Sequence, residues 1–126
     1  MERIYRLLCG ALVGADLFFI VAAQVAFAVA RPQAGELVGG MLARLDAATL
    51  VVAAVLVILA GRRPAALLPL AAGLCAAASV LYFTPQIHAM RLEGQTTGAR
   101  FGMLHGLSTG MLLIEMILHA IAGWIG

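Results

Sequence analysis

The sequence has no lysine and little charge of either sign, since charged residues make up only 11% of its 126 positions. Hydrophobic residues make up 63%, and the mean hydropathy is +1.05. A soluble domain of this length cannot shield so much apolar side chain from water. We therefore expect one integral membrane domain whose main partner is the lipid bilayer.

Other scarcities exclude whole classes of function. The net charge of +2 comes from scattered arginines, which is too little for a nucleic-acid surface. Cys9 and Cys75 lie in apolar stretches without CxxC spacing, so neither a disulfide framework nor a thiolate metal site is predicted. The sequence contains no nucleophile elbow, phosphate loop or HExxH motif, and enzyme activity is therefore the least supported class.

Long apolar runs predict an all-α bundle of four transmembrane helices, because each run approaches the ~20 residues needed to cross the hydrocarbon core. The predicted spans are residues 7–30, 41–60, 65–84 and 101–124. A cleaved signal peptide is the alternative for the first run, but Asp16 and Gln24 inside it argue against that alternative.

Arginines near the short loops predict the orientation. Arg3 and Arg6 precede the first span, and Arg62 and Arg63 fill the tightest turn on the same side. Because positive loops stay in the cytoplasm, we expect both termini there. The expected location is the inner membrane of a bacterium.

Small residues recur on the last span. Gly102, Gly106 and Gly110 are spaced by four, a pattern that lets helix backbones approach closely in membranes. We expect this glycine ridge to pack against other helices, within the chain, in a homo-oligomer or in a membrane complex.

Ionisable residues at membrane depth cost free energy and are treated as candidate functional residues. His105, Ser108, Glu115 and His119 fall on one stripe of the last span, roughly 80° wide. Asp16 and Glu115 share a depth of roughly 14 Å from the inner boundary. If these two acids meet near the midplane, repulsion and low dielectric hold at least one proton there.

A second polar group is predicted nearer the outer side, and its members are Arg44, Asp46, His88, Arg91, His105 and Ser108. These residues would form an outer pocket that handles a small ion, a metal or a proton, with His88 and His105 as candidate metal ligands. Arg44 and Asp46 are two residues apart, so we expect Asp46 to face inward and Arg44 to extend outward. The alternative is a scaffold or accessory subunit in which polar side chains only pin helices together.

Haem binding is a third hypothesis. His105 and His119 lie fourteen residues apart on one helix face, about 21 Å along the axis, so one helix could offer an axial ligand to each of two haems. Six-coordinate haem also needs ligands from another helix, and the only other histidine is His88.

Three segments carry a family resemblance: residues 39–46 (GGMLARLD), 82–91 (YFTPQIHAMR) and 101–108 (FGMLHGLS). They resemble small four-helix membrane proteins like transmembrane protein 205, a family without an established biochemical activity. The resemblance implies that its characteristic positions here are Arg44, Asp46, Pro85, Arg91, His105 and Ser108. It also implies a role in export or trafficking. A proline expected near Gln24 is absent.

Overall fold

The computed structural model describes residues 1–126 and is entirely helical. The elements are α1 (Glu2–Val29), α2 (Ala34–Ala60), the 3-10 helix η1 (Pro64–Ala66), α3 (Leu67–Ala78), the π-helical turn η2 (Ser79–Phe83), α4 (Thr84–Leu92) and α5 (Ala99–Ile125). Elements η1 to α4 form one continuous span, Pro64–Leu92. All four spans, of 28, 27, 29 and 27 residues, are long and apolar enough to cross a membrane. The predicted multi-pass, all-α architecture is thereby confirmed.

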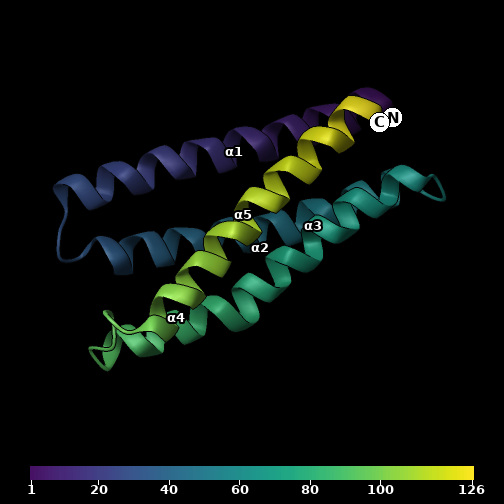
Figure 1. The fold of residues 1–126 in the computed structure, drawn as a ribbon. Helices are drawn as coiled ribbons and strands as arrows, with labels where there is room; N and C mark the ends of the chain where they lie inside the picture. Colours follow the sequence, from purple (N-terminus) through teal and green to yellow (C-terminus); the bar gives the residue numbers. More distant parts are fainter.

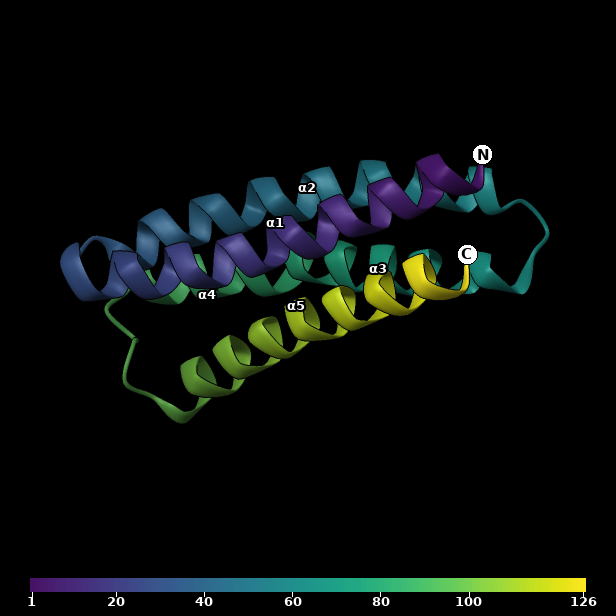
Figure 2. The same cartoon turned by 90° about the horizontal axis from the view of Figure 1, so that it is seen from above.

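The spans form a four-sided bundle in which α1 and α3 each pack against both α2 and α5. Both chain termini and the turn between α2 and η1 lie at one end, which we call the termini end (Figure 1). The connections after α1 and after α4 lie at the opposite end, the loop end (Figure 2). In Figure 1, helices α1 and α5 lie close together near the termini and diverge towards the loop end.

The third span continues beyond Thr84, where the sequence predicted its end. Pro85 has no N–H to donate, and its ring clashes with the carbonyl four residues earlier in a regular α-helix. The π-helical turn Ser79–Phe83 directly precedes this proline and widens the helix where the clash would occur. The backbone hydrogen-bond pattern therefore changes from α-helical to π-helical at mid-length, and the span continues as an α-helix to Leu92.

Helix α2 begins at Ala34, seven residues before the predicted start, despite three glycines in its first turns. Gly35 is buried against Arg91, whose Nη1 donates a 2.7 Å hydrogen bond to the Gly35 carbonyl oxygen. A Cβ at Gly35 would lie 2.6 Å from Arg91 Nε. The glycine is thus required for the guanidinium to reach the α2 backbone.

Apolar side chains close the termini end. The buried cluster there consists of Tyr5, Cys9, Leu12, Leu56, Ala60 and Ala122, and we call it the apolar plug. Large hydrophobic side chains such as Phe18, Ile58 and Leu81 instead point outward and are more than 70% exposed, as expected for surfaces that contact lipid.

The glycine ridge does not pack within the chain. A Cβ on Gly102, Gly106 or Gly110 would meet nothing within 4 Å, so these residues line an outer face of α5. The expectation of packing against other helices of the chain is corrected here, because α5 turns its Leu104, Ser108 and Leu112 stripe inward instead. The close approach on α5 occurs at Gly123, where a Cβ would lie 3.0 Å from Cys9 Cβ.

Candidate functional site

Each span places one polar side chain at the centre of the bundle. These are Asp16 of α1, Asp46 of α2, Ser79 of the third span and Glu115 of α5, and we call them the polar ring. All four are at most 2% exposed. The first three lie within one residue of the midpoint of their spans, and Glu115 lies three residues beyond the midpoint of α5. The polar ring therefore sits near the middle of the four spans.

One hydrogen bond within the ring joins neighbouring spans. Ser79 Oγ donates to Asp46 Oδ2 at 2.6 Å. The other buried carboxyl oxygens have no hydrogen-bond partner, and they are Asp16 Oδ1, Asp46 Oδ1 and both Glu115 oxygens. Asp16, Asp46 and Glu115 lie near enough to one another for their charges to interact. The one salt bridge of the chain, between Arg63 and Glu2, is exposed, so no cation neutralises the ring.

Two further polar side chains lie one helical turn from the ring towards the termini end. Thr49 follows Asp46 by three residues, and His119 follows Glu115 by four. Thr49 is 1% and His119 0% exposed, and Thr49 Oγ1 and both His119 ring nitrogens have no partner. Unpaired buried polar atoms are rare and costly, so this group marks the centre of the bundle as a candidate site.

A large cavity opens on the loop side of the ring, with a volume of about 1210 Å³. Of the residues proposed for the outer pocket, the cavity lining includes Arg44, His88, Arg91, His105 and Ser108. Asp46 is not among the lining residues, because it faces the polar ring. The structure thus divides the predicted outer pocket into a cavity and a deeper carboxyl centre.

The floor of the cavity separates it from the ring by about one helical turn. Phe19 lies three residues beyond Asp16, and Leu112 lies three residues before Glu115. Leu42, four residues before Asp46, completes the floor from α2. Phe19 and Leu112 are 8% and 5% exposed, so an apolar layer lies between the cavity and the acids.

Three arginines line the cavity, and each donates to a helix carbonyl oxygen: Arg31 Nε to Phe27 at 2.8 Å, Arg44 Nη1 to Gly40 at 3.1 Å and Arg91 Nη1 to Gly35 at 2.7 Å. Arg91 also lies over the Phe101 ring, 5.7 Å from its centroid. The arginines are thereby held at the cavity while most of their N–H donors stay free for a ligand.

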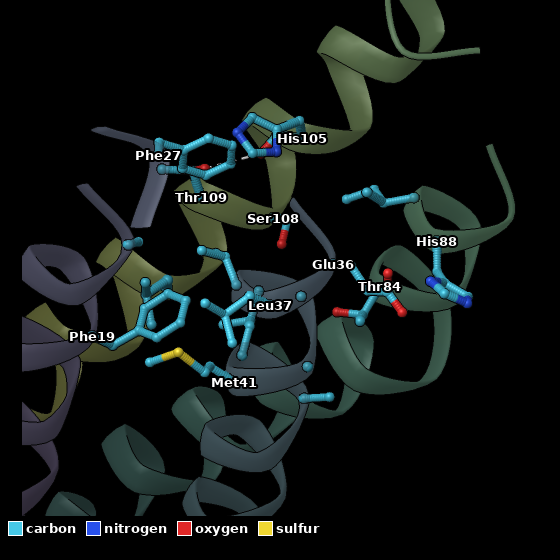
Figure 3. Close-up of a pocket in the computed structure, with 18 of the residues that line it drawn as sticks. Phe19, Phe27, Glu36, Leu37, Met41, Thr84, His88, His105, Ser108 and Thr109 are labelled. Carbon is cyan, nitrogen blue, oxygen red and sulfur yellow. Dashed lines mark hydrogen bonds between the residues drawn. The ribbon is translucent and has the colours of Figure 1, made fainter. Parts of the chain in front are cut away.

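The histidines lie in different environments. His105 is exposed and stacks on Phe101 with a centroid distance of 6.1 Å, and His88 is exposed on α4 (Figure 3). No group of three or more His, Cys, Asp or Glu is placed to hold a metal ion, so these two histidines lack the further ligands that the metal hypothesis needs.

The two candidate haem ligands, which would each serve a different haem, lie in different surroundings. His105 borders the open cavity, whereas His119 is fully buried and does not line that cavity. A macrocycle at His119 would need space that the surrounding helices fill.

Comparisons with known proteins add a family but no activity. Residues 7–96 match a domain of unknown function, DUF4149, and the matched segment covers most of α1 and all of α2 to α4 but not α5. No curated protein and no solved structure matches the chain.

Proposed function

The chain belongs to the DUF4149 family of domains of unknown function, and we propose that it takes up and returns a proton at the polar ring. The cavity would be the entrance from the loop side. The sequence-based hypothesis named an ion, a metal or a proton, and we narrow it to the proton. No basic side chain pairs with the buried carboxyl groups, and no group of three or more side chains is placed to hold a metal ion.

The observation that supports this function is the convergence of three carboxyl groups at mid-membrane without a basic partner. Ionising several of them together would place like charges in a medium of low dielectric, which is costly. Binding of a proton neutralises one of these carboxylates, and release of the proton restores its negative charge. Carboxyl groups at membrane depth in proton-transporting proteins serve this purpose.

The proposed orientation follows from the arginines. Arg3, Arg6, Arg62 and Arg63 lie at the termini end, which we place in the cytoplasm of a bacterial inner membrane. The cavity then opens on the opposite side. The resemblance to transmembrane protein 205 adds, as part of the proposal, that proton uptake serves export or trafficking.

Infrared spectroscopy of the purified protein in lipid tests proton uptake directly. Protonated carboxylic acids have a C=O band that carboxylates lack, and exchange into D₂O shifts it. We expect a band that disappears reversibly as the pH is raised and that shifts in D₂O. Glu115→Gln and Asp46→Asn should each weaken it.

Glu93→Gln is the matched control, because Glu93 is exposed in the loop after α4. That variant should leave the band unchanged. A band that neither titrates nor exchanges would mean that the protons are permanently structural, and absence of the band would mean that the ring holds none. Either result would overturn the proposal.

A scaffold function is the second candidate, and the outward glycine ridge favours it. Because nothing in the chain covers Gly102, Gly106 and Gly110, a helix of another subunit can approach there. Cysteine cross-linking through Gly106→Cys tests this candidate: a cross-linked dimer in native membranes supports it, and exclusively monomeric protein contradicts it.

A further inference from the structure

We infer that the cavity binds a membrane lipid with an anionic headgroup, which enters sideways from the bilayer between α1 and α5. This inference goes beyond the proposed proton function. Lipid binding depends on the cavity and not on the polar ring, so the lipid inference and the proton proposal can each fail without the other.

The divergence of α1 and α5 gives the route of entry. These helices pack together near the termini but separate towards the loop end (Figure 1). The cavity lies at that end and is lined from both helices, by Gln24 and Phe27 of α1 and by His105 and Thr109 of α5. A molecule dissolved in the bilayer therefore meets the cavity without first crossing the aqueous phase.

The lining itself is amphipathic. In Figure 3, the apolar side chains of Phe19, Leu37 and Met41 gather on one side, whereas Glu36, Thr84 and His88 lie on the other. Thr84 Oγ1 is buried and has no hydrogen-bond partner. A volume of about 1210 Å³ exceeds the ~300–1,000 Å³ of ordinary small-molecule sites and suits a ligand with an acyl chain.

The charged side chains of the cavity lining indicate which lipid headgroup would bind there. Arg31, Arg44 and Arg91 line the cavity against the single acid Glu36. Each guanidinium uses one of its five N–H donors on the protein, so several remain for phosphate oxygens. Paired N–H donors match phosphate geometry well. The expected ligand is a phosphate-containing anionic lipid, with its headgroup at the arginines and a chain along the apolar side.

Native mass spectrometry of the detergent-purified protein, titrated with chain-matched lipids, tests this. Phosphatidylglycerol should bind about tenfold more tightly than phosphatidylcholine. Arg44→Gln should remove about that tenfold preference. Ala43→Phe, which places a ring in the cavity lining, should weaken both lipids while leaving Arg44 in place.

Arg62→Gln is the matched control for lipids bound at the periphery, because Arg62 is exposed at the opposite end of the bundle. It should leave the preference unchanged. If Arg44→Gln does not fold, Arg31→Gln removes another cavity arginine. Three results would overturn the inference. They are equal binding of the two lipids, an equal loss of the lipid preference in Arg44→Gln and Arg62→Gln, and full competition by inorganic phosphate alone.

Discussion

Ser79 Oγ and Asp46 Oδ2 are joined by a 2.6 Å hydrogen bond between the third span and α2, near the midpoints of both spans. Asp46 Oδ1 has no partner, so this hydroxyl is the only hydrogen-bond donor to the carboxyl group. Its position depends on the π-helical turn, in which Ser79 is the first residue. The bond thus links the wide turn of one span to the buried acid of another.

Removing that hydroxyl should destabilise the fold. Ser79→Ala leaves Asp46 without a donor, and we expect a loss of about 1–3 kcal/mol in the free energy of unfolding. Thermal unfolding in detergent measures this. Thr109→Ala is the control, because its exposed hydroxyl bonds only to the His105 carbonyl of its own helix. Equal unfolding temperatures for the two variants would show that the Ser79 bond contributes nothing.

Alkaline pH should also lower stability. The charged form of a buried carboxyl group without a cation is disfavoured in the fold, so stability is present while the ring is protonated and is lost as the pH rises. The ring acids share this region with Cys75 and His119, and no basic side chain pairs with them. Glu115→Gln should reduce the pH dependence of the unfolding temperature. A wild-type unfolding temperature that is constant from neutral to alkaline pH would contradict this prediction.

Two glycines of α5 should respond differently to the same substitution. Gly123→Leu forces a side chain against Cys9 and should cost about 1–3 kcal/mol through overpacking. Gly106→Leu adds its side chain in open space and should leave the unfolding temperature of the monomer unchanged. If the ridge binds a second subunit, Gly106→Leu should reduce the oligomer size measured by light scattering. A large loss of monomer stability in Gly106→Leu would contradict the outward placement of the ridge.

The topology can be tested with reporters. A fusion after Gly126 and an accessible cysteine replacing the exposed Pro64 should report the same side of the membrane, since the C-terminus and the turn between α2 and η1 lie at the termini end (Figure 1). A cysteine replacing Gln95 in the loop after α4 should report the opposite side. We expect Gly126 to be cytoplasmic. A periplasmic Gly126 would reverse the proposed orientation without changing the bundle.

Apolar run length was sufficient to predict four spans, because the energetics of the bilayer dominate in this chain. The ends of the helices were harder to predict from the sequence. The first turn of α2 contacts Arg91, whose guanidinium donates to Gly35 across 56 positions of sequence, and no local pattern reveals this contact. The continuation past Pro85 depends on the preceding π-helical turn, and a proline at a span end predicts a stop more often than a wide turn.

The sequence predicted Asp46 to face inward and Arg44 outward, as the structure places them, but both residues were assigned to one outer pocket. The depth of Asp46 near Arg44 suggested the outer pocket, whereas the helical angle between the two residues turns Asp46 to the ring and leaves Arg44 at the cavity. Ser79 and Thr49 were not predicted as site residues. Thr49 carries a signal, since it follows Asp46 by three residues on the same face, but the inward placement of Ser79 requires the third span to be positioned against α2.

The apolar plug has an electrical consequence. A proton that enters from the loop end crosses one apolar layer of about one helical turn to reach the polar ring, whereas the apolar plug, which runs from Tyr5 to Leu12 on α1, closes the remaining path over about two turns. The proton therefore stops near the middle of the spans. It therefore crosses about half of the transmembrane field, which corresponds to ~1 kcal/mol for each 100 mV. The occupancy of the ring should then follow the membrane voltage without any steady current, so the molecule would behave as a capacitor and not as a conductor.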